Sequence, residues 1–487
     1  MGNITVKNRR MGLLRQLGCV ITAVGILWLA TQGCSRQAVK HWHTEKLTEE
    51  FTADRIPEIE TFEKYLQLED RLFEQLAQAV YAHTGSGPEF ALVRYSRGSA
   101  ADPQVRTPNW NRTFAFPVDA PAGGVLLLHG MSDSPYSLRA LGEALHQRNY
   151  WVIGLRLPGH GTAPSGLTRV KWEDMAAAVA LSVAHLTSKV GRKPIHIIGY
   201  STGAALAVNF ALDSLERDEV RVPASLVLLS PAIGIHPAAG LAQWKRRFSI
   251  LPGLGGLAWM QIEPEFDPYK YNSFATNAAE QVHRLTTTVA RRVSSRARAH
   301  PDNVLPPTLV FKSTVDATVS TDAVIDRLLG KLAPHRHELV LFDINRSAAY
   351  SSLLVSDPGP LTTRLMDSKD LPFTVTFITN ENSKSTAVAA RRQGPFASHV
   401  SAMQPLGLQW PVGVLSLSHV ALPFPPDDPL YGSNPPGEKD RLFLGRMAVQ
   451  GERGLLKLPE SWFLRLRHNP FYDYLEKRVH AWVDAAR

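Results

Sequence analysis

Residues Gly199-Tyr200-Ser201-Thr202-Gly203 form a G-x-S-x-G pattern that separates two apolar runs of different character. The run before it, residues 194–198, has the short β-branched composition of a buried strand, and the alanine-rich run after it, residues 202–208, predicts the start of a helix. A serine on a tight turn between strand and helix is held clear of the sheet, and only small neighbours fit beside it. The pattern therefore predicts a strained turn that presents the hydroxyl of Ser201 to a substrate.

The chain around this turn alternates between strand-like and helix-like segments. Apolar runs at 125–128, 151–155, 195–198, 226–229 and 308–311 predict buried strands, and residues 137–148 and 171–190 predict helices between them. Apolar strands separated by amphipathic helices are typical of a parallel sheet covered on both faces. We therefore expect an α/β fold with a doubly wound, mostly parallel sheet, whose active site lies at the carboxyl ends of the strands.

The remaining segments suggest a division of the chain into parts with different roles. We expect a signal peptide or membrane anchor at 1–34, a polar tether at 35–56, and a helix with loops packing on the core at 57–119. The first part of the core spans 120–233, a cap insertion 234–300, and the second part of the core 301–487. That last part contains predicted strands at 338–342 and 373–377 and an insertion at about 344–410.

Composition limits the kinds of partner and site that the chain can offer. The formal charge of +9 falls to +5 without residues 1–33, which leaves 49 basic against 44 acidic residues. No basic stripe with interleaved aromatic residues is present, so we expect no nucleic-acid partner. The two cysteines, Cys19 and Cys34, exclude a cysteine-based metal site and a disulfide within a mature chain, and we expect no metal.

The N-terminus has the pattern of an export signal. A basic segment ends at Arg15, an apolar run spans residues 17–30, and Gly33-Cys34 resembles a bacterial lipoprotein processing site, although Thr31 stands where that site usually has leucine. Cys34 is therefore a candidate for lipidation, with an uncleaved anchor or an ordinary signal peptide as the alternatives. We expect the chain to reach the bacterial cell envelope as a membrane-anchored protein or a lipoprotein, with its main domain outside the cytoplasm.

A serine hydroxyl becomes a nucleophile only when a base accepts its proton and an anion orients that base. On a sheet of this kind the acid and then the histidine follow the serine along the chain. Asp316 is the favoured acid because it comes just after the predicted strand 308–311, and Asp343, after the next strand, is the rival.

His419 is the favoured base because it directly follows the apolar run 413–418, which we interpret as a strand. His399 is the rival. His335 and His337 are less suitable because they precede a predicted strand and so belong to the wrong end of the sheet.

A tetrahedral oxyanion needs N–H donors that are already in position. The backbone of Thr202 supplies one directly after the serine, and we expect Met131, in the loop after the strand 125–128, to supply the other. His129 is expected to hold that loop, and Asp133 to cap it. The predicted cap contains aromatic residues that either line an acyl pocket or form a small core of the cap, namely Trp244, Trp259, Phe266, Tyr269 and Tyr271.

Together these segments resemble the α/β-hydrolase superfamily, especially its monoacylglycerol-lipase-like and carboxylesterase-like branch. The resemblance rests on residues 128–135, 157–161 and 199–203 and on the segments around Asp316 and His419. It implies hydrolysis of a small-molecule ester or lipid through an acyl-serine intermediate, with no cofactor. The 103 residues between Asp316 and His419 are more than the family usually has, which predicts the insertion before the histidine.

Three other functions remain open from the sequence. A serine peptidase on the same scaffold would bind a free amino terminus through acidic residues, for which Glu263, Glu265 and Asp267 are candidates. An acyltransferase would pass the acyl group to an acceptor other than water. A non-catalytic envelope binding protein would retain the scaffold without turnover. The oligomeric state does not follow from the sequence.

Overall fold

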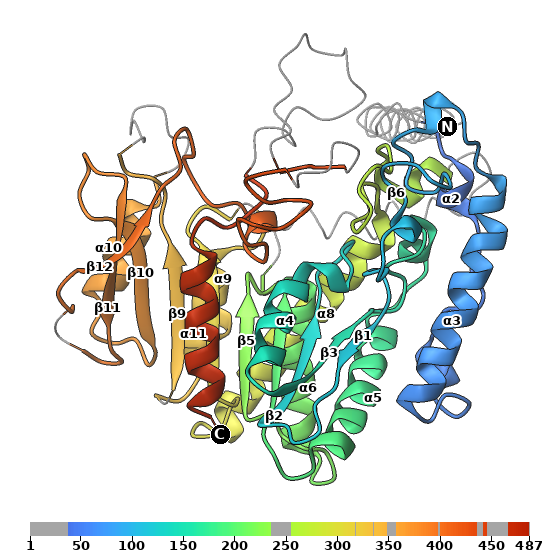
Figure 1. Cartoon of the computed structure of the whole chain (residues 1–487). Coiled ribbons are helices and arrows are strands. Elements are labelled where there is room, and N and C mark those ends of the chain that lie inside the picture. The colour runs from blue at the N-terminus through green and yellow to red at the C-terminus, as the bar shows by residue number, and fades with distance from the viewer. Residues whose placement is uncertain are drawn as a thin grey trace, which may run out of the picture.

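One ten-stranded sheet runs through the molecule (Figure 1). The structure is a computed structural model that describes residues 38–234, 255–316, 318–334, 336–347, 357–397, 400–435, 442–445 and 466–486. The spatial order of the strands is β1-β3-β2-β4-β5-β8-β9-β10-β11-β12. Their bounds are β1 Phe114–Phe116, β2 Gly123–Leu128, β3 Tyr150–Leu155, β4 Ile195–Tyr200, β5 Ser225–Leu229, β8 Thr308–Ser313, β9 His337–Phe342, β10 Thr374–Asn380, β11 Ala387–Gln393 and β12 Gln404–Gln409.

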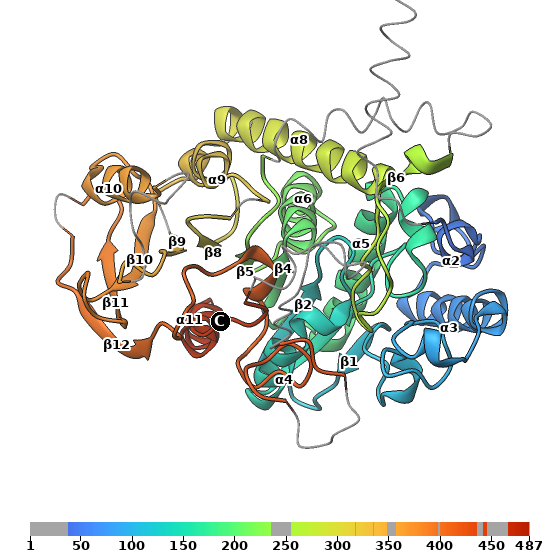
Figure 2. The ribbon, with the colours of Figure 1, turned by 90° about the horizontal axis from the view of Figure 1, so that it is seen from above.

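The seven strands from β3 to β10 all run parallel, and only the edges are antiparallel. Helices cover both faces of this sheet (Figure 2). One face carries α5 (Trp172–Val190), α6 (Thr202–Glu216), α8 (Thr276–Ala299), α9 (Thr321–Arg327) and α10 (Gly359–Asp367), and the other carries α4 (Arg139–Gln147) and α11 (Tyr472–Asp484). This arrangement confirms the predicted α/β fold with a mostly parallel, doubly covered sheet.

Alternation along the strands divides the core between the two faces. In β2, Leu126 and Leu128 pack with the helices of the larger layer, while Val125 and Leu127 pack with α4 and α11. Successive side chains of a strand point to opposite faces, so a strand buried on both sides must be apolar at every position. This is why the central strands are recognisable in the sequence as unbroken apolar runs.

The segment expected to be a polar tether packs on the core from residue 38 onward. It contains a short helix, α2 (His41–Thr44), in which Trp42 is buried, and Phe51 is buried further along. The following helix, α3 (Phe62–Ala79), begins at Thr61, whose side chain accepts a hydrogen bond from the Lys64 N–H. Buried aromatic residues therefore correct the prediction of a tether, and the signal or anchor at 1–34, with Cys34, lies outside the described residues.

The predicted cap at 234–300 contains elements of two kinds. The strands β6 (Trp259–Gln261) and β7 (Phe274–Ala275) form a small separate ribbon. Helix α8 instead packs along α6 with Leu285, Val289 and Val293 in the core, as a crossover helix between β5 and β8. Among the helices of the described residues, we find none that is both long enough and apolar enough to cross a membrane.

The predicted insertion at about 344–410 extends the central sheet. Strand β10 pairs parallel with β9, and β11 and β12 follow as antiparallel neighbours. Figure 1 shows these strands in orange at one end of the sheet, with the chain returning from them toward α11. Besides α9 and β9, the long separation between Asp316 and His419 therefore contains three additional strands and α10.

Candidate active site

Ser201 lies on a sharp turn between β4 and α6, at the carboxyl edge of the sheet. Its backbone has φ 53° and ψ −113°, a conformation that non-glycine residues rarely adopt. The Ser201 N–H donates to the Leu229 carbonyl at 2.9 Å, and its own carbonyl accepts from the Ala232 N–H at 3.0 Å. These bonds to the end of the neighbouring strand β5 hold the strained turn in place.

The two glycines of the motif are required by the close approach of helix and strand. A Cβ atom on Gly203 would lie 2.1 Å from the Leu128 carbonyl oxygen, so α6 passes directly over the end of β2. A Cβ atom on Gly199 would lie 2.5 Å from the Ala204 backbone. A larger side chain at either position would push the helix away from the sheet and move Ser201 with it.

Asp316 follows β8 and is held by four donors. Its Oδ1 accepts from the backbone N–H groups of Thr318 and Val319, at 2.8 and 3.0 Å. Its Oδ2 accepts from the ammonium of Lys312 at 2.8 Å and lies 2.9 Å from Nδ1 of His419. Because a carboxylate only accepts hydrogen bonds, Nδ1 of His419 carries the proton and Nε2 is free to act as a base.

The charge of Asp316 is stabilised despite its burial. Burial by itself raises the pKa of the Asp316 carboxyl, but the hydrogen bond from His419 and the positive charge of Lys312 outweigh it and hold the pKa well below its usual range. The Lys312 side chain is fully buried, and it also donates to the Val319 carbonyl at 2.7 Å. Asp316 is therefore an anion at neutral pH.

His419 reaches this edge from a loop. Residues 413–418 do not form the strand that we expected, and their pairing with the sheet is a single bridge between Ser416 and Ile344. The chain then enters a short 3-10 helix at His419, whose carbonyl lies 3.3 Å from the Tyr200 hydroxyl. The Tyr200 and His419 rings are 5.3 Å apart, which places the imidazole beside the serine turn.

The alternative candidates for the acid and the base either bind other groups, lie at the other end of the sheet, or fall outside the described residues. Asp343 forms hydrogen bonds at 2.9 and 3.0 Å with the guanidinium of Arg346, and it accepts another from Thr379 at 2.8 Å. His337 begins β9, at the opposite end of the sheet. His335 and His399 fall outside the described residues.

A cavity of about 380 Å³ brings together four of the five predicted site residues, namely Met131, Ser201, Thr202 and His419, with Asp316 behind the histidine. Its other walls are mostly apolar and come from the predicted cap, α8 and the loops beside them, as Met260, Phe274, Ala279, Val282, Val319 and Val420. The cap aromatics do not line it: Trp259, Phe266, Tyr269 and Tyr271 are buried among other side chains, and Trp244 lies outside the described residues.

The loop after β2 is arranged beside Ser201. Thr202 is the first residue of α6, where a backbone N–H has no acceptor within the helix. A Cβ atom on Gly130 would lie 3.2 Å from the Ser201 Cβ, so this glycine permits the close approach of the loop that carries Met131. Nε2 of His129 accepts from the Leu157 N–H at 3.0 Å, and Nδ1 donates to the Gly130 carbonyl at 2.9 Å. This histidine holds the loop, as its position in the sequence suggested.

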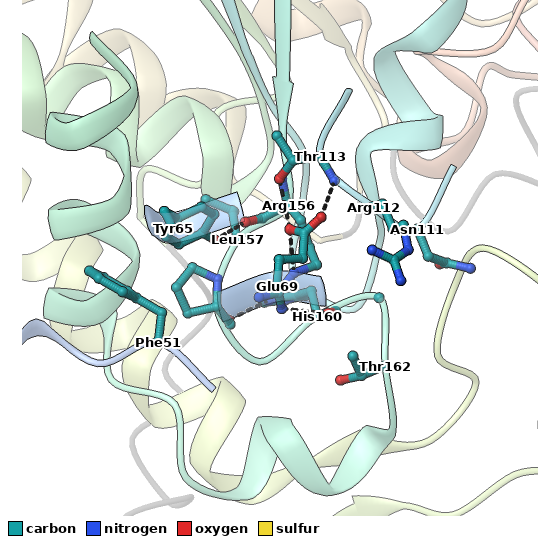
Figure 3. A network of polar contacts seen from close by, with 12 residues as sticks. Phe51, Tyr65, Glu69, Asn111, Arg112, Thr113, Arg156, Leu157, His160 and Thr162 are labelled. Carbon is teal, nitrogen blue, oxygen red and sulfur yellow. Dashed lines mark hydrogen bonds and ion pairs between the residues drawn. The ribbon is translucent and has the colours of Figure 1, made fainter. Parts of the chain in front are cut away.

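A network of ion pairs connects the N-terminal segment to the loop after β3, which begins at Arg156 (Figure 3). Arg156 is fully buried, and its guanidinium donates to Glu69 at 2.9 Å and to both carboxylate oxygens of Glu50 at 2.9 and 3.0 Å. The Tyr65 hydroxyl donates to the Arg156 carbonyl at 2.6 Å. Because Leu157 follows directly and its N–H donates to His129, this arginine connects the N-terminal segment to the loop after β2.

Two lysines near the site were not identified from the sequence. The role of Lys312 could have been inferred from its position. A lysine inside a buried apolar strand needs a buried anion beside it, and Asp316 follows four residues later. Lys270 lines the cavity and donates to Asp133 at 2.9 Å, which links the segment after β6 to the loop after β2. The residues next to Lys270 and Asp133 in the sequence give no indication that these two side chains pair.

Comparisons with known proteins match the middle part of the chain. Residues 119–344 match the family model described as serine aminopeptidase, S33. A thermostable monoacylglycerol lipase from Bacillus sp. (strain H-257) is 28% identical over 196 residues, which are 40% of this chain and 71% of that protein. The magnesium-chelatase 30 kDa subunit of Rhodobacter capsulatus is 34% identical over 131 residues, 27% of this chain and 44% of that protein.

Among solved structures, one described with the metagenome-derived lipolytic enzymes LipS and LipT has a TM-score of 0.39 and 20% identity, over 48% of this chain and 87% of that one. The strained serine turn, the order of the strands and the matched sequence region agree with one another. The chain has an α/β-hydrolase fold, and over its middle part it is similar to the serine aminopeptidase S33 family and to a monoacylglycerol lipase.

Proposed function

We propose that this protein is an exported serine hydrolase that cleaves carboxylic esters with an apolar acyl or alcohol part. The observation that carries the proposal is the shared cavity: Ser201 and His419 line one mostly apolar space, and Asp316 orients the histidine from behind. A cavity of about 380 Å³ is within the range of small-molecule sites, and its apolar walls suit a hydrocarbon chain.

The proposed reaction proceeds in two steps through an acyl-serine. Oγ of Ser201 attacks the ester carbonyl while Nε2 of His419 takes its proton, and the imidazolium then protonates the leaving alcohol. Asp316 accepts from Nδ1 and stabilises the transient cation. The N–H groups of Thr202 and Met131 are proposed to bind the oxyanion. Water, activated by the same histidine, then releases the acid and restores the serine.

The contacts of the acidic residues favour esters over peptides. Glu265 accepts hydrogen bonds from the N–H groups of Asn272 and Ser273, and Asp267 accepts from the Tyr431 hydroxyl at 2.6 and 2.7 Å. Glu263 accepts from the Gln261 amide. None of these three acids lines the cavity that contains Ser201, so no carboxylate from this group is available there to bind a substrate's amino terminus.

A fluorophosphonate probe tests the nucleophile. We expect labelling of the wild type and complete loss of labelling in Ser201→Ala, whereas the control Ser132→Ala, changed in the same cavity, keeps it. The turnover of short-chain p-nitrophenyl esters should fall by at least about 10³-fold in Ser201→Ala alone. Equal labelling of Ser201→Ala and wild type would remove the assignment. A preference for aminoacyl p-nitroanilides over esters would favour the peptidase.

Export and membrane attachment are a separate part of the proposal, because they rest on residues 1–34. Cell fractionation should recover the full chain with the envelope membranes, and labelled fatty acid should be incorporated into it. Replacement of Cys34 by serine should abolish the incorporation if lipidation occurs there, while envelope recovery without incorporation would indicate an uncleaved anchor.

A further inference from the structure

A second, larger cleft lies apart from the cavity that contains Ser201. Its volume is about 840 Å³, and it is lined mainly by the loops of residues 86–110, together with Tyr136, Arg139, Tyr269 and Pro429. It shares no lining residue with the cavity of Ser201 and His419. We refer to this space as the arginine cleft. The proposed hydrolysis has no role for it.

The charged residues that line the arginine cleft are all positive. They are Arg97, Arg106 and Arg139, and no aspartate or glutamate is among the lining residues. Within the described residues, the buried Nε atoms of Arg106 and Arg139 have no hydrogen-bond partner. Neither guanidinium is therefore fully satisfied by hydrogen bonds within the described residues.

The nearby acids offset only part of this charge. Arg139 uses Nη1 to bind Glu143 at 2.8 Å, and its Nη2 lies 3.6 Å from Asp428. Arg106 donates to a neutral group, the Ala100 carbonyl, at 3.3 Å, and has no ion pair among the described residues. Arg97 is exposed. The cleft therefore retains positive charge from at least two of its arginines.

Aromatic rings form the apolar part of the cleft. Tyr136 and Tyr269 stack with their centroids 4.1 Å apart, and the Arg139 guanidinium lies 5.3 Å from the Tyr136 ring and 5.6 Å from that of Trp110. Burial raises the pKa of Tyr269 to about 12, while the charges of Arg106 and Arg139 act in the opposite direction. The arginine charges and the rings therefore lie around the same space.

We propose that the arginine cleft is a second binding site, for an organic anion that joins a carboxylate to an aromatic or similarly flat apolar body. A guanidinium presents parallel N–H donors that match a carboxylate, and flat rings favour stacking with a flat ligand. The volume is sufficient for a ligand of about this size, since small-molecule sites span roughly 300 to 1,000 Å³. This inference does not depend on the reaction proposed for Ser201.

Isothermal titration of the full chain with 2-naphthoate, compared with neutral 2-naphthalenemethanol, tests the proposal. We expect the anion to bind at least about tenfold more tightly than the alcohol, as one charge-assisted hydrogen bond allows. Arg106→Gln should weaken 2-naphthoate at least about tenfold. Arg112→Gln is the matched control, because Arg112 pairs with Asp70 outside the cleft, and it should leave binding unchanged.

Two further measurements keep the test decisive. Arg97 is exposed, so Arg97→Gln should fold even if Arg106→Gln does not, and it should weaken 2-naphthoate about threefold. Prior reaction of Ser201 with a fluorophosphonate should leave 2-naphthoate binding unchanged. Equal affinity for the acid and the alcohol, unchanged affinity in both arginine variants, or loss of binding after fluorophosphonate treatment would each overturn the proposal.

Discussion

The replacement Lys312→Met tests how the fold holds its proposed acid. Lys312 is completely buried in β8, and its ammonium makes two hydrogen bonds, to Asp316 and to the Val319 carbonyl. Methionine retains most of the side-chain volume but removes the charge and both bonds. Any loss of stability therefore reports on the buried ion pair rather than on a cavity.

The structure sets the size of the expected effect. Removal of one partner from a buried ion pair costs about 3–5 kcal/mol, because the other charge is left uncompensated. Asp316 keeps the N–H donors of Thr318 and Val319 and its contact with His419, so we expect the lower value, about 3 kcal/mol. At roughly 2 °C per kcal/mol for a domain of this size, the Tm should fall by about 6 °C.

Catalysis should be affected much less than stability. The backbone donors still orient the Asp316 carboxylate toward His419, so kcat for a short-chain p-nitrophenyl ester should fall by no more than about tenfold. Asp316→Asn, which removes the anion itself, should reduce kcat by about 10⁴-fold, as in other serine triads.

Thermal unfolding followed by circular dichroism, together with ester kinetics, provides the assay. Lys331→Met serves as a control because Lys331 is exposed, and it should match the wild type in both measurements. An unchanged Tm in Lys312→Met would refute the energetic argument. An unchanged Tm with a kcat as low as that of Asp316→Asn would show instead that Lys312 itself orients the acid.

Two further predictions concern the turn that carries Ser201 and the change of stability with pH. Gly203→Ala should lower the free energy of unfolding, measured in urea, by at least about 3 kcal/mol, because the new Cβ would lie 2.1 Å from the Leu128 carbonyl oxygen. A loss below about 0.5 kcal/mol would contradict the close approach of α6 and β2. Burial lowers the pKa of His43 and of His160 to about 4, so the unfolded chain binds protons that the native state does not. Their contribution to stability is present above about pH 6.5 and is lost as the pH falls to about 4, so urea unfolding at pH 5 should give about 2 kcal/mol less per histidine than at pH 7. Equal stability at the two pH values would contradict this assignment.

Most of the central sheet could be predicted from the sequence. Strands β2, β3, β4, β5 and β8 match the apolar runs closely, because strands buried on both faces leave a continuous local signal. Strands β11 and β12, near the C-terminal end of the sheet, were not predicted from the sequence. Strand β12 lies at the edge with several exposed residues, so its composition does not distinguish it from a loop.

The position of His419 was predicted for a reason that the structure corrects. We inferred a strand at 413–418 from its apolar residues, but the segment is a loop that contacts residues 344–345, just past β9, through one bridge and the hydrogen bonds of Asn345. Its apolar residues were a poor guide because only Leu417 is fully buried: Val414 is half-buried, Leu415 is exposed, and Val412, just before the segment, is fully exposed. What brings the histidine to Asp316 is the return of the chain from the additional strands.

By itself, the sequence determined the central strands of the sheet, the serine turn with its required glycines, and the place of Asp316 after β8. These depend on hydrophobic alternation and backbone geometry, which neighbouring residues encode. Only the tertiary structure decided how other distant charges are paired, such as Glu50 with Arg156 across 106 positions and Asp133 with Lys270 across 137. The sequence does not distinguish a buried charged residue from an exposed one, because its ion-pair partner is a distant residue that only the fold brings near.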